Sequence, residues 1–254
     1  MIPSWRRIVR RFLRRFAPSP VLDSLEMRRA IRSNPVIPKL FELIDRERSA
    51  IDVGANVGLF TLALHRRASK VIAFEPLPAL AAELRHRFGP SIQVLEVALS
   101  DRAGTTTLFV PYEGQRAIES RASLNDDANP KLALRPLKVE RRRLDDYGFH
   151  DVGIIKIDVE GHELAVLQGA EQTIRRCRPA LIVEIEERHH PGRSGEIIQY
   201  ILSLGYAGLF LRDDDLVGIE QFDFATMQNE KNAKRPFAQG SDSYINNFIF
   251  VPQP

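Results

Sequence analysis

Several features that mark particular classes of protein are scarce in this 254-residue sequence. Its single cysteine, Cys177, excludes an internal disulfide framework and fits a reducing compartment. No apolar run approaches the roughly 18 residues that a membrane-spanning helix needs. Internal repeats and low-complexity tracts are also absent. With an apolar fraction of 44%, the chain is expected to form one domain of ordinary size in the cytoplasm.

Positive charge is concentrated at one end of the chain. Residues 1–16 contain six arginines and no acid, so taking them away from the formal net charge of +3 leaves −3 for the remainder. A nucleic-acid footprint would instead place basic residues across a binding face. We therefore expect no nucleic-acid partner.

The same N-terminal segment has the pattern of an amphipathic helix. Its apolar residues recur at helical spacing and leave the arginines to the other side: Trp5, Ile8, Val9, Phe12, Leu13 and Phe16. One interpretation is peripheral contact with an anionic membrane, on its inner face. The other is packing on the rest of the chain or on a second subunit, and the oligomeric state stays open. We assign residues 1–35 to this basic extension and residues 36–254 to the main domain.

Residues 50–60 predict a short apolar strand, a tight turn and the start of a helix. Gly54 can adopt a positive φ and leave room for a flat ligand, and Gly58 lets the helix pack close to the strand. The turn reads G-x-N-x-G, not the G-x-G-x-x-G of dinucleotide sites, and Asp52 precedes it. A carboxylate there would repel a diphosphate but attract a cofactor that carries an ammonium and a sulfonium. The turn thus disfavours a nicotinamide oxidoreductase.

Two further strands are predicted beside this unit. Residues 71–74 end in Glu75 and Pro76, and an acid in that position can accept hydrogen bonds from both hydroxyls of a ribose. Residues 92–98 predict a third strand, whose end would bring Ala98 beside an adenine.

Two other segments are expected to shape the site. A helix over residues 37–44, with proline in its first turn, is expected to cover the approach to the cofactor. Residues 111–136 are polar and turn-rich, and a loop of that length in a compact domain is usually functional or disordered. We interpret this loop as a flap that faces the substrate.

A second group of titratable residues follows the buried strand predicted over residues 152–157. Asp158, Glu160 and His162 crowd into the strand-to-helix turn, where α/β enzymes place their chemistry. Glu163 is also explained by the helix dipole, which favours an acid in the first turn. Lys156 lies within the strand and is expected to pair with a carboxylate.

These motifs together resemble the FkbM family of methyltransferases. The resemblance extends over residues 50–251, outside the basic N-terminus, and is carried by I-D-V-G-A-N-V-G at 51–58, F-E-P at 74–76, A-L-S-D at 98–101, L-D-D at 144–146, K-I-D-V-E-G-H-E at 156–163, L-x-G-A at 167–170, R-P at 178–179 and N-F-I-F at 247–250. It implies the class I methyltransferase fold, a Rossmann-like three-layer α/β/α sandwich. Its mostly parallel seven-stranded sheet would have an antiparallel last strand.

The resemblance also implies a function, O-methylation of a hydroxyl on a sugar, glycolipid or secondary metabolite with S-adenosyl-L-methionine as methyl donor. The residues implied for cofactor binding are Asp52, Gly54, Ala55, Asn56, Gly58, Glu75, Pro76, Ala98 and Asp158. Asp158, Glu160 and His162 are the candidates for the base that takes the hydroxyl proton. Carboxylates there would also suit a divalent cation, although we predict no metal site. The alternative is a non-catalytic module that binds a membrane or a partner through its basic helix.

Overall fold

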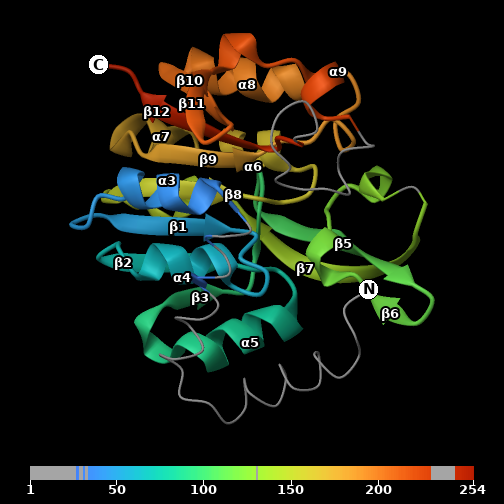
Figure 1. Cartoon of the computed structure of the whole chain (residues 1–254). Coiled ribbons are helices and arrows are strands. Elements are labelled where there is room, and N and C mark those ends of the chain that lie inside the picture. The colour runs from blue at the N-terminus through green and yellow to red at the C-terminus, as the bar shows by residue number, and fades with distance from the viewer. Residues whose placement is uncertain (1–26, 29–30, 32–33, 130, 230–243) are drawn as a thin grey trace.

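The computed structural model of the chain describes residues 27–28, 31, 34–129, 131–229 and 244–254 (Figure 1). The predicted amphipathic helix over residues 1–16 lies outside these ranges, as does most of the proposed extension. Within the described part of the chain, no helix is both long enough and apolar enough to cross a membrane.

The described residues form a central eight-stranded sheet in the order β11-β10-β12-β9-β8-β1-β2-β3 (Figure 1). The five strands from β3 to β9 in that order are parallel, and β12 is antiparallel to both of its neighbours. The bounds are β1 Ser49–Val53, β2 Lys70–Phe74, β3 Gln93–Leu95, β8 Val152–Ile157, β9 Ala180–Glu184, β10 Tyr206–Arg212, β11 Asp215–Gly218 and β12 Asn247–Pro252. This order confirms a mostly parallel sheet with an antiparallel last strand.

Helices cover both faces of the sheet. Successive residues of its apolar strands point to opposite faces, so each face presents apolar side chains that the helices bury. Ala50 of β1 packs with residues of the helices on one face, and Ile51 packs with residues of the helices on the other. The first face carries α3 Val36–Leu43, α4 Leu59–His65 and α5 Pro78–Phe88. The second carries α6 Glu163–Gln168, α7 Glu171–Cys177 and α8 Ser194–Ser203, while the short α9 Phe224–Met227 precedes β12. The expected three-layer α/β/α sandwich is therefore present.

A second sheet, of four strands among the described residues, stands beside the main one (Figure 1). Its order is β4-β7-β5-β6, with bounds β4 Ala98–Leu99, β5 Gly104–Glu113, β6 Arg116–Ala117 and β7 Ala133–Arg142. β5 and β7 pair antiparallel along their length, from Gly104 opposite Arg141 to Tyr112 opposite Ala133. This hairpin corrects the prediction of a continuous loop over residues 111–136, since strands take up both ends of that segment.

The predicted strand over residues 92–98 is also corrected. It is two strands in two sheets: β3 pairs with β2, whereas Ala98 and Leu99 pair with Arg141 and Arg142 of β7. The chain thus passes from the main sheet to the second one between Leu95 and Ala98. The main sheet has eight strands instead of seven because β11 adds a hairpin partner to β10.

Candidate active site

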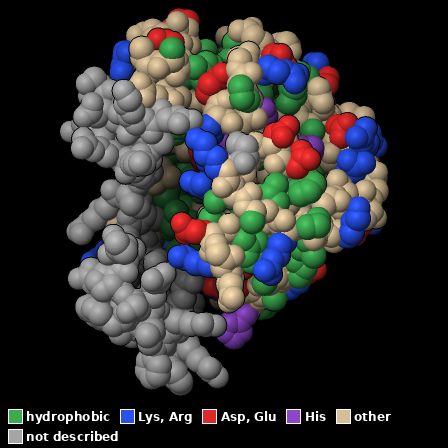
Figure 2. All heavy atoms as spheres, turned by 90° about the vertical axis from the view of Figure 1, so that its right-hand side faces the viewer, with side chains coloured by type: hydrophobic (Ala, Val, Ile, Leu, Met, Phe, Trp, Pro, Cys, Tyr) green, Lys and Arg blue, Asp and Glu red, His purple; other side chains and the backbone are tan. Residues whose placement is uncertain are grey.

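A cavity of about 380 Å³ opens at the carboxyl ends of β1, β2 and β8, a volume typical of small-molecule sites. Figure 2 shows this side of the molecule, where charged and hydrophobic side chains are interspersed. Of the predicted site residues, only Gly58 does not line the cavity; the others are Asp52, Gly54, Ala55, Asn56, Glu75, Pro76, Ala98, Asp158, Glu160 and His162. Helix α3 contributes no lining residue and packs on α4, so the prediction that it covers the approach to this cavity is wrong.

The glycine turn after β1 is shaped by close backbone contacts. Gly54 has a φ of +78°, and its N–H donates to the carbonyl of Phe74 at 3.0 Å. A Cβ at Gly54 would lie 1.9 Å from the carbonyl oxygen of Asp158. Glycine is therefore required so that the ends of β1 and β8 can meet. The predicted positive φ is confirmed, and because Gly54 also lines the cavity, the room that it leaves for a ligand stays a prediction.

Gly58 serves a neighbouring helix. Its φ is +81°, and a Cβ there would lie 2.7 Å from Leu84 and 2.9 Å from Phe88, both on α5. The predicted close approach thus occurs, but to α5 rather than to the strand.

Asp52 lies within β1 and is almost fully buried. Its carboxylate accepts a hydrogen bond of 2.5 Å from the Thr61 hydroxyl on α4. Burial raises the pKa of Asp52 to about 6, although Thr61 and Lys156 act to lower it. A cationic group of a bound ligand would stabilise the ionised carboxylate.

Glu75 follows β2 and is also buried. One carboxylate oxygen accepts from the backbone N–H of Asn56 at 2.7 Å and the other from that of Leu77 at 2.9 Å. Burial raises the pKa of Glu75 to about 7. Each oxygen keeps a second lone pair, so the carboxylate can still accept hydrogen bonds from two ligand hydroxyls.

One part of the cavity wall is apolar and is partly built by the second sheet. Val97, Ala98 and Leu99 line it from the segment that crosses between the sheets, and Leu108 lines it from β5. A flat, apolar ring such as adenine would be buried favourably there.

The segment between β6 and β7 completes the cavity. It contributes Glu119, Ser120, Arg121, Ala122 and Leu124 to the lining. The flap was predicted as a whole, but these individual residues were not, because neither their spacing nor their type marks them.

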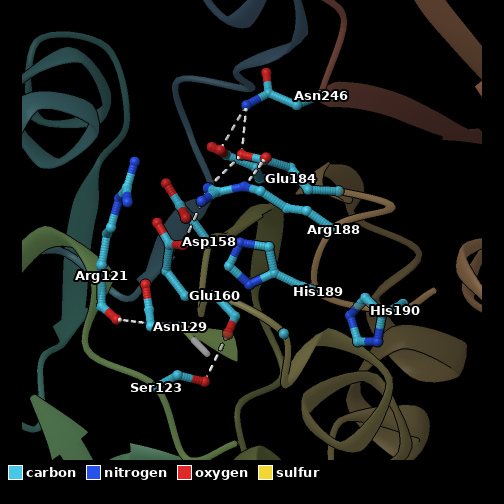
Figure 3. Close-up of polar contacts among 12 residues, drawn as sticks. Arg121, Ser123, Asn129, Asp158, Glu160, Glu184, Arg188, His189, His190 and Asn246 are labelled. Atoms are coloured by element: carbon cyan, nitrogen blue, oxygen red, sulfur yellow. Dashed lines mark hydrogen bonds and ion pairs between the residues drawn. The ribbon is translucent and has the colours of Figure 1, made fainter. Parts of the chain in front are cut away.

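Residue Ser123 of this segment ties it to the turn after β8. Its hydroxyl donates to the backbone carbonyl of Glu160 at 2.6 Å (Figure 3). The flap is thereby attached to the turn that carries the candidate catalytic residues.

Lys156 is fully buried, and its pairing with carboxylates is confirmed. Its Nζ lies 3.8 Å from Asp158 and 3.9 Å from Glu184. Burial, followed by the charge of Asp158, raises the pKa of Glu184 well above its usual range. Asp158 therefore faces the cavity with a buried cation behind it.

Glu160 has a left-handed backbone conformation, with a φ of 53°. Its carboxylate contacts two basic side chains. It lies 3.4 Å from the Arg188 guanidinium and 3.2 Å from His189 Nε2 (Figure 3). Burial, followed by the charge of Asp158, raises the pKa of Glu160 to about 8. Arg188 also pairs with Glu186.

His162 contacts Ser100, which lies next to the second sheet. Its Nε2 lies 3.0 Å from the Ser100 hydroxyl. Burial lowers the pKa of His162, so the imidazole is neutral at pH 7. The neighbouring Glu163 instead faces His190 at 2.6 Å and accepts from the Gly161 N–H at 2.9 Å, a structural role at the start of α6.

Three polar residues beside the cavity were missed by the sequence reasoning. Thr61 forms a hydrogen bond with Asp52, Ser100 with His162 and Arg188 with Glu160. Ser100 stands in the A-L-S-D motif, which was the one available signal, whereas Thr61 and Arg188 lie in segments without a distinctive pattern.

These features fit S-adenosyl-L-methionine. Asp52 and Asp158 supply negative charge for its ammonium and sulfonium, Glu75 supplies acceptors for its ribose, and the apolar wall supplies a surface for its adenine. Among the residues that the structure covers, no three His, Cys, Asp or Glu side chains are grouped so as to hold a metal ion.

The strand order and the cavity at the carboxyl edge define the class I methyltransferase fold. Consistent with this, the chain resembles the crystal structure of Methyltransferase FkbM from Methylobacillus flagellatus KT, with a TM-score of 0.51 and 17% sequence identity over 83% of this chain and 45% of that one. The family model described as the Methyltransferase FkbM domain matches residues 52–207. The chain belongs to this family of methyltransferases.

Two curated relatives are methyltransferases whose names specify an oxygen position. The chain is 30% identical to the 2-O-methyltransferase NoeI of Sinorhizobium fredii, over 60% of this chain and 70% of that protein. It is 28% identical to the 31-O-demethyl-FK506 methyltransferase FkbM of Streptomyces tacrolimicus, over 66% of this chain and 76% of that protein. Across five curated relatives, the matched stretch spans from 10% to 76% of the relative's own length.

Proposed function

We propose that this chain transfers a methyl group from S-adenosyl-L-methionine to a hydroxyl of a small molecule or glycan. The observation that carries the proposal is the single cavity in which both buried acids, Asp52 and Glu75, meet the turn with Asp158, Glu160 and His162. Its relatives NoeI, named a 2-O-methyltransferase, and FkbM, named a 31-O-demethyl-FK506 methyltransferase, support a hydroxyl as the acceptor.

The cofactor is assigned to the half of the cavity formed by β1 and β2. Asp52 and Asp158 would hold its positive end, Glu75 its ribose hydroxyls and Ala98 one face of its adenine. The backbone of Ala55, Asn56 and Pro76 would complete the cradle. Once bound, the cofactor supplies an electrophilic methyl on a sulfonium.

His162 is the base that we propose for the acceptor hydroxyl. It lines the cavity and is neutral at pH 7, so it can accept a proton there. Glu160 is less suited because its carboxylate already faces Arg188 and His189. Asp158 is less suited because Lys156 lies behind it and its charge is needed toward the sulfonium. The flap residues Glu119, Ser120 and Arg121 would then contact the acceptor at the rim.

The acceptor is proposed to be a sugar, glycolipid or secondary metabolite. For a lipid-linked acceptor, the predicted basic helix over residues 1–16 would hold the chain at an anionic membrane. Sedimentation with anionic vesicles tests this part: the full chain should bind, and a chain without residues 1–16 should not. Equal binding of both chains would contradict it.

The reaction itself is tested with methyl-labelled cofactor and a panel of hydroxylated acceptors. The panel would include sugars, glycolipids and macrolide alcohols, and the product would be analysed for an O-methyl ether. His162→Asn should lower kcat by roughly 100-fold or more without preventing cofactor binding. The matched control is His150→Asn, an exposed histidine outside the cavity, which should keep the native rate.

A further inference from the structure

We propose that Ser100 is a positioning residue, which fixes the proton of His162 on Nε2 and leaves Nδ1 free to accept the acceptor's proton. The inference rests on the proposed role of His162 as base. Which of the two ring nitrogens of His162 carries the proton is a property of the ligand-free protein, so it can be measured apart from catalysis.

The geometry is a chain of three polar groups. The Ser100 hydroxyl donates to Oδ1 of Asp101 at 2.9 Å, and the hydroxyl oxygen of Ser100 lies 3.0 Å from His162 Nε2. A serine hydroxyl has one proton, and a carboxylate can only accept. With that proton directed to Asp101, the remaining contact is satisfied only if Nε2–H of His162 donates to the Ser100 oxygen. Nδ1 is then unprotonated in the neutral ring.

Ser100 is held rigidly enough to impose this choice. It is fully buried, and its backbone N–H donates to the carbonyl of Arg142 at 2.9 Å. Its carbonyl oxygen also lies against Gly169: a Cβ added to Gly169 would be 1.9 Å from this oxygen. The second sheet and the junction between α6 and α7 thus fix the backbone of Ser100 from two directions. A fixed hydroxyl can orient an imidazole, whereas a mobile one could not.

The other groups around His162 do not replace Ser100. Burial lowers the pKa of His162, Glu163 and Asp101 raise it, and Arg141 and His190 lower it. The carboxylate of Glu163 is taken by His190 and the Gly161 N–H. Only Ser100 forms a hydrogen bond with the His162 ring among the described contacts.

The direct test is 15N NMR of the ligand-free full-length chain, with labelled histidine and His162 assigned by His162→Gln. The proposal expects the Nε2–H tautomer at pH 8. In Asp101→Ala the serine hydroxyl loses its acceptor and can donate to His162, so the Nδ1–H form should grow. Ser100→Ala should leave a mixture of both tautomers. A predominant Nδ1–H tautomer in the native chain would overturn the proposal.

The matched control is Ser194→Ala. Ser194 is as fully buried as Ser100, but its hydroxyl has no hydrogen-bond partner among the residues that the structure describes and lies outside the cavity. It should leave the tautomer unchanged. If Ser100→Ala fails to fold, Asp101→Ala alone decides, since Asp101 is exposed and its truncation leaves no cavity in the core.

Kinetics supply a second readout. Ser100→Ala and Asp101→Ala should lower kcat at least 10-fold and change its pH profile, with little change in the KM for the cofactor. A native chain with the expected tautomer and no methyl transfer would refute the proposed function but not the orientation of His162. Full kcat in both variants would refute the positioning role but not the function.

Discussion

The carboxylate of Glu75 accepts a hydrogen bond of 2.7 Å from the backbone N–H of Asn56, and this bond joins the end of β2 to the glycine turn after β1. Asn56 itself has a left-handed conformation, with a φ of 50°. The acid assigned to the ribose thus also holds the turn assigned to the rest of the cofactor. Changes at Glu75 should therefore affect both halves of the cofactor site.

Cofactor affinity should depend on pH. Because the pKa is about 6 for Asp52 and about 7 for Glu75, both carboxylates become ionised between pH 5 and pH 8. Their negative charge attracts the sulfonium and ammonium, so binding should tighten by 10-fold or more over this interval. Calorimetric titration at pH 5.5 and pH 8 measures it. Affinity that is flat, or that weakens as the pH rises, would contradict the assignment.

The stability of the ligand-free chain should change in the opposite direction. The folded pKa of Asp52, about 6, lies above the value of about 4 for an unfolded chain. Between those values the folded state binds more protons, so the free energy of unfolding falls as the pH rises, by on the order of 3 kcal/mol in total. Urea denaturation across pH 4–7 should show this fall, and Asp52→Asn should make it shallower. An unchanged slope in the variant would contradict the buried, perturbed carboxyl.

Gly54→Ala should destabilise the fold and remove cofactor binding, because the new Cβ would overlap the Asp158 carbonyl. Gly114→Ala is the matched control. Its φ of +61° is also left-handed, but no atom of the described part of the chain lies within 4 Å of its added Cβ, so only the backbone cost of about 1–2 kcal/mol applies. Thermal unfolding should show a clearly larger loss for Gly54→Ala. Equal losses would show that the Asp158 contact does not matter.

Lys156→Met should cost about 3–5 kcal/mol of stability, because it leaves Asp158 and Glu184 without their buried cation. Lys138→Met removes an exposed ammonium that donates a hydrogen bond to the Thr107 hydroxyl, and it should cost less than about 1 kcal/mol. The difference is measured by urea denaturation at pH 7.5. A near-neutral Lys156→Met would mean that both acids are protonated in the folded chain.

Ser123→Ala should loosen the flap. It removes the hydrogen bond to the Glu160 carbonyl, which is worth about 1 kcal/mol, and leaves that carbonyl without this donor. The KM for the acceptor should rise several-fold while cofactor affinity changes little. Ser203→Ala, at the exposed end of α8, should change neither. A native KM for the acceptor in Ser123→Ala would contradict a role of the flap in acceptor binding.

The main sheet and most of the cavity could be predicted from sequence because both depend on short local patterns. Asp52 lies near the end of an apolar strand, and Glu75 and Asp158 directly follow two others, so these acids come to one edge of a parallel sheet, whatever the intervening lengths. The second sheet could not be predicted in the same way. Its long β5–β7 hairpin pairs residues some thirty positions apart, and its register is set by tertiary packing rather than by a turn motif.

The contacts that orient the site were harder to predict for a related reason. Ser100, Arg188 and Thr61 reach the site from separate segments. The sequence around each of them does not indicate which residue it will contact in the fold. The close approach of the Asp158 carbonyl to Gly54 could not be predicted, because Asp158 is more than a hundred residues away in the chain.

The most direct test of the account is calorimetric titration of the native chain with S-adenosyl-L-methionine, beside Asp52→Asn and Glu75→Gln. Glu113→Gln, an exposed acid outside the cavity, is the matched control. We predict saturable binding that both cavity substitutions weaken at least 10-fold and the control leaves unchanged. Native-like affinity in both cavity variants, or no binding by a folded native chain at pH 8, would contradict the account.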